Sequence, residues 1–154
     1  MEEVLDIYSP LSGKVIPVSE VSDPVFAQKL LGDGVGIIPN ENKVYAPCDA
    51  EIATLFPTGH AIGLHSALGP DLIIHIGRNT NKLNGKYFSY HVKAGDKVKK
   101  GDLIMEFDRD RIISEGFDIT TPVTITNSKN FIAIVPAENP AKSAGDHILS
   151  VLIK

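Results

Sequence analysis

The sequence lacks the features that mark secreted and membrane-spanning proteins. Cys48 is the only cysteine, so no disulfide can form within the chain, and a lone thiol is typical of a reducing compartment. No run of about 18 apolar residues predicts a transmembrane helix. The acidic start, Met1-Glu-Glu, has no signal-peptide pattern. We therefore expect a cytoplasmic protein in which Cys48 is a small buried apolar residue.

Basic residues are too few and too scattered to predict binding to nucleic acid. The 15 Lys and Arg residues are outnumbered by 19 Asp and Glu residues, which gives a formal net charge of −4. Phosphate backbones favour clustered cations, whereas the one basic cluster, Lys97 to Lys100, is interrupted by Val98 and fits a solvated turn. The length of 154 residues predicts a single domain over residues 1–154, with one core. We expect a monomer.

Long helical patterns are also missing, and short runs rich in Val, Ile and Thr take their place. Many short strands separated by Gly and Pro are typical of an all-β protein, here an antiparallel β-sandwich or barrel. We predict strands over residues 4–7, 14–18, 43–46, 51–56, 60–64, 72–76, 87–92, 103–107, 119–126, 131–135 and 147–153. Only short helical turns are expected, one from Asp23-Pro24 to about Leu30 and one from Asp108 to about Gly116.

One segment of the sequence is repeated in altered form. Tyr8-Ser-Pro-Leu-Ser-Gly-Lys-Val15 resembles Tyr45-Ala-Pro-Cys-Asp-Ala-Glu-Ile52, and both lead from a bend at proline into a predicted strand. A single repetition is too little for a solenoid, which needs about three repeats. It predicts instead two related halves that fold back on each other, as in a barrel-sandwich hybrid.

The most informative stretch has two histidines on neighbouring predicted strands. His60 begins the first strand, and His75 ends the second in Asp71-Leu-Ile-Ile-His75-Ile-Gly77. A hairpin centred between Ala67 and Leu68 places His60 directly opposite His75, where Cβ atoms are roughly 4.5–5.5 Å apart. Two imidazoles at that separation can hold one small group between them.

The chemistry available to such a pair is phosphoryl transfer. A neutral imidazole is a good nucleophile near pH 7, because its unperturbed pKa is about 6.5. His75 can therefore accept a phosphoryl group while His60 donates a hydrogen bond to the phosphoryl oxygens, with Thr58 orienting the His60 ring. Gly77 leaves room for a phosphate or a backbone to approach. A histidine on an apolar strand can also be structural, and these residues alone leave both interpretations open.

The two histidine motifs belong to a wider set of segments that covers nearly the whole chain. The most specific are Thr58-Gly-His60 and Leu72-Ile-Ile-His75-Ile-Gly77. The others are Ile7-Tyr-Ser-Pro-Leu-Ser-Gly13, Gly32-Asp-Gly-Val-Gly-Ile-Ile-Pro39, Pro47 to Ile52, Lys82-Leu-Asn-Gly85, Gly95-Asp-Lys-Val-Lys-Lys-Gly101 and Thr121-Pro-Val-Thr-Ile-Thr-Asn127. Together they resemble the glucose-family enzyme IIA of the bacterial phosphoenolpyruvate-dependent sugar phosphotransferase system. The resemblance implies an antiparallel β-sandwich with almost no helix.

The resemblance also implies a phosphotransferase component that acts as a carrier. His75 matches the histidine that takes a phosphoryl group at Nε2 from the histidine-containing phosphocarrier protein and passes it to a cysteine of the enzyme IIB domain of a sugar permease. His60 matches a second active-site histidine that supports transfer, and Thr58 matches its hydrogen-bonding partner. Gly77 matches the residue whose carbonyl orients the His75 ring, and Asp33 an acidic residue beside the site.

Docking of these partners needs an exposed apolar rim. The matching segments offer Val25, Phe26, Val35, Ile37, Phe56 and Tyr87, each of which could equally be a core residue. The membrane would be reached only through the permease. Some relatives bind zinc through the two histidines when a partner adds a carboxylate, but two histidines fall short of a four-coordinate site. We expect no cofactor and no stable metal.

The sequence departs from the family directly after Gly77. The usual continuation is an apolar residue followed by Asp-Thr, whereas this chain has Arg78-Asn79-Thr80. Asn79 removes a negative charge that would repel a phosphoryl dianion, and Arg78 adds a cation. We hypothesise that the phosphorylated state is somewhat favoured here.

Two other classes of protein are alternatives. A zinc metallopeptidase on a related β-hybrid fold would need a His-x-His or His-Glu-x-x-His pattern, and none of the five histidines shows it. A lipoyl or biotinyl carrier domain is suggested by Val92-Lys-Ala-Gly-Asp-Lys-Val-Lys-Lys-Gly-Asp-Leu103. No lysine there has the flanking residues of a modified lysine, and the chain is about twice the length such a domain needs.

Overall fold

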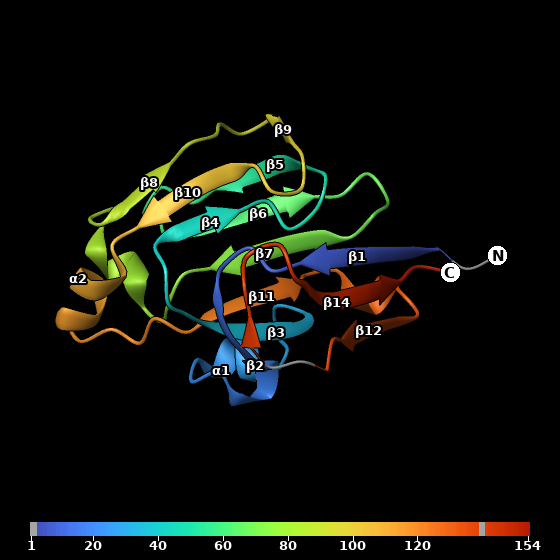
Figure 1. Cartoon of the computed structure of the whole chain (residues 1–154), viewed down its shortest axis with the longest axis horizontal. Helices are drawn as coiled ribbons and strands as arrows, with labels where there is room; N and C mark the ends of the chain where they lie inside the picture. The colour runs from blue at the N-terminus through green and yellow to red at the C-terminus, as the bar shows by residue number, and fades with distance from the viewer. Residues whose placement is uncertain (1–2, 139–140) are drawn as a thin grey trace.

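The computed structural model describes residues 3–138 and 141–154, and most of its regular structure is β-strand (Figure 1). The strands are β1 (Val4–Tyr8), β2 (Gly13–Pro17), β3 (Asp33–Pro39), β4 (Lys43–Tyr45), β5 (Ala50–Leu55), β6 (Ala61–His65), β7 (Asp71–His75), β8 (Phe88–Tyr90), β9 (Lys97–Val98), β10 (Leu103–Phe107), β11 (Thr121–Ile125), β12 (Ala133–Pro136), β13 (Ala141–Lys142) and β14 (His147–Leu152). The α-helices are α1 (Pro24–Ala27) and α2 (Arg109–Ser114). Three further segments are 3-10 turns, namely Val18–Glu20, Thr80–Leu83 and Ser128–Asn130.

The strands form three antiparallel sheets that pack as a sandwich. The largest has the order β13-β2-β3-β11-β7-β6-β5-β9, and the smaller ones are β1-β14-β12 and β4-β10-β8. In Figure 1, β4, β5 and β10 lie above β7, and β2, β3 and β11 lie below it. Within the described residues each strand order is open at both ends, so the predicted antiparallel β-sandwich is confirmed and the barrel is not closed.

All eleven predicted strands are present, with ends that differ by a few residues. Three strands were missed, namely β3, β9 and β13. Glycines obscure β3, because Gly34 and Gly36 interrupt its alternation of apolar residues. A Cβ atom at Gly34 would lie 2.1 Å from the carbonyl oxygen of Val123, so glycine lets β3 approach its partner β11 closely.

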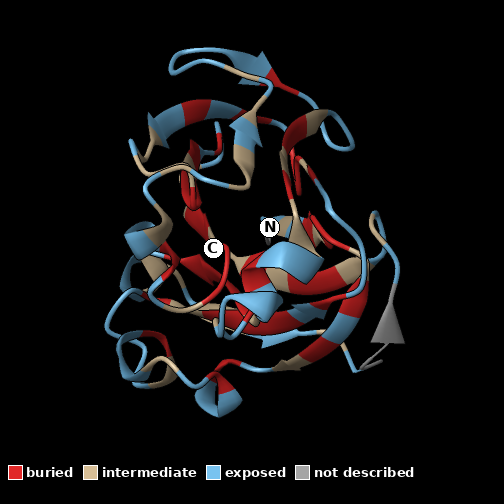
Figure 2. Cartoon of the chain, turned by 90° about the vertical axis from the view of Figure 1, so that its left-hand side faces the viewer, coloured by how far each residue is buried: buried red, intermediate tan, exposed pale blue. Residues whose placement is uncertain are grey.

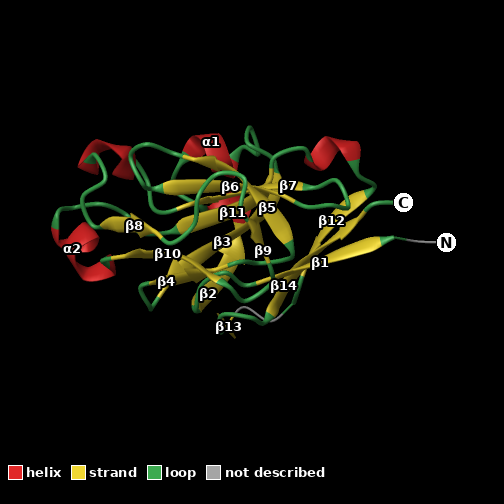
Figure 3. Ribbon diagram, turned by 90° about the horizontal axis from the view of Figure 1, so that it is seen from above, coloured by secondary structure: helices red, strands yellow, loops and turns green. Residues whose placement is uncertain are grey.

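The helices are short and begin where the sequence predicts. Asp23 caps α1, since its carboxylate accepts a hydrogen bond from the Val25 N–H, and Pro24 occupies the first position. Asp108 caps α2 by accepting from the Arg111 N–H. The helices lie at the periphery of the strand body (Figure 3). Among residues 3–138 and 141–154, no helix combines the length and the apolar composition needed to cross a membrane.

The two faces of β7 point into different apolar clusters. Leu72, Ile74 and Ile76 belong to the main core, which also includes Cys48 as a buried residue. Ile73 faces the other way and packs in a second cluster with Val18, Val21 and Phe26. Figure 2 shows buried residues along the strands and exposed ones on turns and helix surfaces. His75, two residues after Ile73, therefore shares the face of the second cluster.

The repeated segments pair with each other, as predicted for two related halves. The Tyr8 N–H donates to the Pro47 carbonyl at 2.9 Å, and the Tyr45 N–H donates to the Pro10 carbonyl at 2.8 Å. These two bonds exchange equivalent residues of the repeat. The two bends thus meet around a local two-fold relation.

Each bend of the repeat is also closed by an equivalent Gly-Asp turn. The Gly101 N–H donates to the Ala46 carbonyl at 2.9 Å, and the Gly145 N–H donates to the Ser9 carbonyl at 2.9 Å. In the first turn the Asp102 carboxylate accepts from the Lys99 N–H at 2.9 Å. In the second turn the Asp146 carboxylate accepts from the Ser143 N–H at 2.9 Å. In each turn the aspartate carboxylate thus accepts from the backbone N–H three residues before it.

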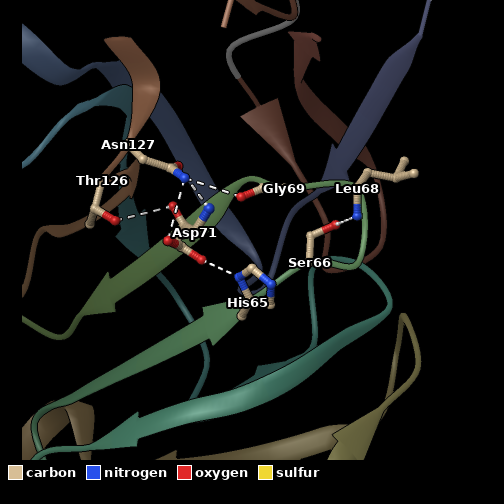
Figure 4. A network of polar contacts seen from close by, with 7 residues as sticks. All are labelled: His65, Ser66, Leu68, Gly69, Asp71, Thr126 and Asn127. Carbon is tan, nitrogen blue, oxygen red and sulfur yellow. Dashed lines mark hydrogen bonds and ion pairs between the residues drawn. The ribbon is translucent and has the colours of Figure 1, made fainter. Parts of the chain in front are cut away.

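The turn of the β6–β7 hairpin sets its register (Figure 4). The Ser66 N–H donates to the Pro70 carbonyl at 2.9 Å, and His65 pairs with Asp71 across the base of the turn. Asn127 donates from its amide to the Gly69 carbonyl at 3.1 Å. The turn is consequently centred on Leu68, and the predicted centre between Ala67 and Leu68 is wrong by half a residue.

The Gly-Asp turns give a first prediction. Replacing Asp102 by Ala removes the acceptor of the Lys99 N–H, so we expect the free energy of unfolding to fall by about 1 kcal/mol in urea denaturation. Asp102→Asn keeps an oxygen in the same place and should lose less than half of that amount. Equal stability of the two variants would contradict this account of the turn.

Candidate active site

The rings of His75 and His60 lie against each other at one end of the β6–β7 hairpin. Their centroids are 4.7 Å apart, and the planes meet at 82°. The predicted pairing of these residues is wrong, because Ala61 lies opposite His75. The strand register differs by one residue from the predicted one, because the turn is centred on Leu68. A shift of this kind inside a strand would send one histidine to the opposite face.

The His60 ring still reaches His75 because His60 lies before β6 begins. Gly59 has φ +76°, a conformation that turns the chain just ahead of His60. The His60 carbonyl accepts from the Ile76 N–H at 2.8 Å and holds the backbone to β7. Outside the regular strand, the His60 side chain is free of the alternation of faces.

A single hydrogen bond determines the tautomer of His75. Its Nδ1 lies 2.8 Å from the Gly77 carbonyl oxygen, which can only accept. Nδ1 therefore has the proton, and Nε2 of the neutral ring keeps its lone pair. Gly77 has φ +75°, and a Cβ there would lie 2.7 Å from both the Asp118 carbonyl oxygen and Thr80 Cγ2. The space that glycine provides is thus occupied by this chain's own backbone.

The turn that holds His60 is fastened by side chains from two places. Thr58 Oγ1 lies 2.6 Å from His60 Nδ1. The Tyr90 hydroxyl lies 2.9 Å from the Phe56 carbonyl and 2.5 Å from the Ala61 carbonyl, which flank the turn. Sequence reasoning missed Tyr90, since nothing local connects β8 with a turn about thirty residues earlier.

Two phenylalanines extend the histidine pair into a row of four rings. Phe26 of α1 lies 5.0 Å from His75, and Phe56 lies 5.6 Å from His60, measured between ring centroids. Phe26 is only 2% exposed. These rings cover the outer sides of the two histidines.

Both histidines are held in the neutral state. Burial, and to a smaller extent the neighbouring charge of His75, lower the pKa of His60 to about 4. Burial also lowers the pKa of His75, while the hydrogen bond to Gly77 and the charge of Asp23 oppose that shift. At pH 7 the site contains two uncharged imidazoles.

Asp23 is the acidic residue whose charge acts on the pKa of His75. From the sequence it is assigned only to the cap of α1. Asp33 lies farther along the sheet. It pairs with Ile125, which pairs with Leu72, so Asp33 is two strands and three residues from His75, or about 14 Å between Cα atoms by strand geometry. Its carboxylate accepts from the Gly34 N–H and lies 3.5 Å from Lys29 Nζ.

The proposed apolar rim divides into exposed and buried members. Val25 is 40% exposed, and Phe56 and Tyr87 are partly buried. Phe26, Val35 and Ile37 are at most 2% exposed, so their candidacy as exposed rim residues is wrong. The alternating pattern of β3 explains the two on that strand, because they point into the main core.

No group of three or more His, Cys, Asp or Glu side chains within residues 3–138 and 141–154 is placed to hold a metal ion. The ligand set that a zinc metallopeptidase needs is therefore not found in this part of the chain.

Comparison with known proteins identifies the family. The family model for the phosphoenolpyruvate-dependent sugar phosphotransferase system, EIIA 1, matches residues 5–131. The structure superposes on glucose permease IIA from Mycoplasma capricolum with a TM-score of 0.87 and 29% identity, covering 96% of each chain.

Relatives by sequence are longer proteins. The beta-glucoside-specific EIIBCA component of Dickeya chrysanthemi is 45% identical over 130 residues, which are 84% of this chain and 21% of that protein. The glucose-specific EIICBA component of Staphylococcus saprophyticus is 51% identical over 123 residues, which are 80% of this chain and 18% of that protein. The chain thus spans about a fifth of these curated relatives. It belongs to the EIIA 1 family of the phosphoenolpyruvate-dependent sugar phosphotransferase system.

Proposed function

We propose that His75 carries a phosphoryl group on Nε2 during sugar uptake. One observation carries this proposal, the hydrogen bond from His75 Nδ1 to the Gly77 carbonyl at 2.8 Å. It leaves a lone pair on Nε2 of a neutral ring, which is the form of imidazole that attacks phosphorus.

The transfer requires little from the protein beyond position. The Nε2 lone pair forms a bond to phosphorus as the P–N bond of a donor phosphohistidine breaks, and the electron pair of that bond stays on the donor nitrogen. The His75 ring is then positively charged, and its Nδ1–H still donates to the Gly77 carbonyl, whose dipole stabilises the charge. In the second step a thiolate attacks phosphorus, and the electron pair returns to Nε2.

His60 and Thr58 support the phosphoryl oxygens in this proposal. When the Thr58 hydroxyl donates to His60 Nδ1, the proton of the neutral ring is on Nε2, which can donate to a phosphoryl oxygen. A neutral donor stabilises the dianion less than a cation would, because it adds no net positive charge to attract the dianion. The group therefore stays easy to pass on. Gly77 orients His75, and Asp33 is the acidic residue of this proposal, as the family resemblance implies.

The partners follow from the family. We propose that the donor is the histidine-containing phosphocarrier protein and the acceptor is a cysteine of an enzyme IIB domain. The relatives are named EIIBCA and EIICBA components, and these names, which combine an EIIA part with EIIB and EIIC parts, support an EIIB acceptor. We further propose that residues 1–154 act as one monomeric, cytoplasmic domain that meets the membrane only through the permease.

Phosphoryl labelling tests the role of the two histidines. With phosphoenolpyruvate, enzyme I and the histidine phosphocarrier protein, we expect the mass to rise by one phosphoryl group that is labile in acid and stable in alkali. His75→Ala should abolish this addition, and His60→Gln should accept the group but pass it on at least tenfold more slowly.

The matched control is His91→Ala, because His91 is exposed and its ring hydrogen-bonds only to Glu106 among the described residues. It should accept and pass on the group at the wild-type rate. Labelling that survives in His75→Ala would overturn the assignment of the phosphorylated residue.

The low pKa of His60 predicts how stability depends on pH. The unfolded chain binds a proton at His60 near pH 6.5, whereas the folded chain binds it only near pH 4. Stability is therefore complete above about pH 6.5 and falls as the pH drops towards 4. Between pH 8 and pH 5, the free energy of unfolding of His60→Gln should fall by about 1–2 kcal/mol less than that of the wild type, as measured by urea denaturation. Parallel losses in both proteins would contradict the burial of a neutral His60.

Replacing Asn79 by Asp should shift the equilibrium of phosphoryl transfer between the donor and this protein. Asn79 is exposed and has φ 61°, a conformation that Asp tolerates as well as Asn. If the separation is roughly 8 Å, a carboxylate at position 79 would repel the phosphoryl dianion by about 1 kcal/mol in water. Asn79→Asp should lower the equilibrium ratio of phosphorylated to free protein by roughly two- to sixfold in low salt. An unchanged ratio would mean that this position does not influence the site.

A further inference from the structure

Three residues from separate segments close a ring of hydrogen bonds beside the active site. The Arg78 N–H donates to the Asp118 carbonyl at 2.9 Å. The Asp118 carboxylate accepts from the Ser22 hydroxyl at 2.6 Å, and the Ser22 carbonyl accepts from the Arg78 guanidinium at 2.9 Å. We name these three residues the Ser22–Arg78–Asp118 ring. It joins the segment before α1, the segment after β7 and the segment before β11.

The ring holds the peptide unit that orients His75. The Gly77 carbonyl, which accepts from His75 Nδ1, and the Arg78 N–H belong to the same peptide plane. The C=O and N–H of a peptide unit point in opposite directions within one plane. Because the Arg78 N–H is bonded to the Asp118 carbonyl, the peptide unit cannot rotate freely, and the direction of the Gly77 carbonyl is fixed with it. A second Asp118 carboxylate oxygen accepts from the Thr120 N–H at 2.9 Å, which anchors Asp118 itself.

The ring also holds the helix that covers His75. Ser22 directly precedes Asp23, the cap of α1, and Phe26 of that helix packs against the His75 ring. With only four residues, α1 has little stability of its own and depends on such anchors. Both groups that touch the outer side of His75, the Gly77 carbonyl and the Phe26 ring, are therefore tied to the same three residues.

We propose that Ser22, Arg78 and Asp118 are positioning residues of the phosphoryl-accepting histidine. They act through Gly77 and α1 to keep His75 in the Nδ1–H tautomer, with the lone pair on Nε2. The bond between the Asp118 carboxylate and the Ser22 hydroxyl is charge-assisted, as is the bond from the Arg78 guanidinium to the Ser22 carbonyl. This inference rests on the proposed role of His75, but its structural part can be measured without any phosphoryl transfer.

Ser22→Ala and Asp118→Ala test the ring, since neither side chain is buried and both variants should fold. We expect the rate of phosphoryl transfer from the histidine phosphocarrier protein to fall roughly tenfold, because a small displacement of a reacting group is costly. In nitrogen-15 spectra of the His75 side chain, the wild type should show the Nδ1–H tautomer alone, and the two variants a mixture of both tautomers. Asp118→Asn keeps an oxygen for the Ser22 hydroxyl and should restore most of the rate.

Ser150 and Asp6 provide the matched control. The Ser150 hydroxyl donates to the Asp6 carboxylate at 2.7 Å, joining β14 to β1 in a different sheet from β7. Ser150→Ala and Asp6→Ala remove the same kind of bond and should leave both the transfer rate and the His75 tautomer unchanged. An equal slowing in the control variants, or a single Nδ1–H tautomer and wild-type rate in Ser22→Ala and Asp118→Ala, would overturn the positioning role.

The same measurements separate this inference from the proposed function. A wild-type protein that gains no phosphoryl group on His75 would refute the proposed function, and the tautomer of His75 would still report whether the ring orients it. Normal labelling of the wild type together with an unaltered tautomer in the variants would refute the ring alone.

Discussion

The chemistry of this site depends on the hydrogen bond between His75 Nδ1 and the Gly77 carbonyl. A carbonyl oxygen can only accept, so the bond decides which ring nitrogen has the proton and which has the lone pair. The two residues are separated only by Ile76 at the end of β7, which makes the contact short-range and stiff. It persists only if the Gly77 carbonyl cannot rotate. Glycine at φ +75° with the Asp118 backbone packed against it meets that condition.

Around this bond the fold keeps both imidazoles uncharged. Burial lowers the pKa values of both histidines, and Phe26 and Phe56 cover their outer sides. A carrier has to receive a phosphoryl group and release it again, so neither a strongly stabilising cation nor a strongly repelling anion is wanted at the reacting atom. Two neutral imidazoles provide a nucleophile and a hydrogen-bond donor of moderate strength. Asp23 is the charged residue whose effect reaches His75, and its carboxylate is engaged in capping α1.

The support for the site is a pair of related halves. The repeated bends at Tyr8 and Tyr45 exchange hydrogen bonds, and their Gly-Asp turns use the same contacts twice. The β6–β7 hairpin lies in the large sheet between β5 and β11, with the aliphatic face of β7 in the main core. A strand fixed on both edges and on one face leaves little freedom to the residue at its end. His75 occupies that place, whereas His60 is held by a turn that Thr58 and Tyr90 fasten.

The sequence by itself determined the elements that depend on local patterns. Alternating apolar runs predict eleven of the strands, Asp23 and Asp108 mark the helix starts, and the segment Thr58 to Gly77 contains both histidines and their closest partners. Only the tertiary structure decided the register, which follows from a turn held by Asn127, and the strand β3, whose glycines pack against residues distant in the chain. It also brought Phe26, Tyr90 and the Ser22–Arg78–Asp118 ring to the histidines. Local patterns report which face of an element is apolar, but contacts between distant segments depend on how the sheets close, and no short stretch of sequence contains that information.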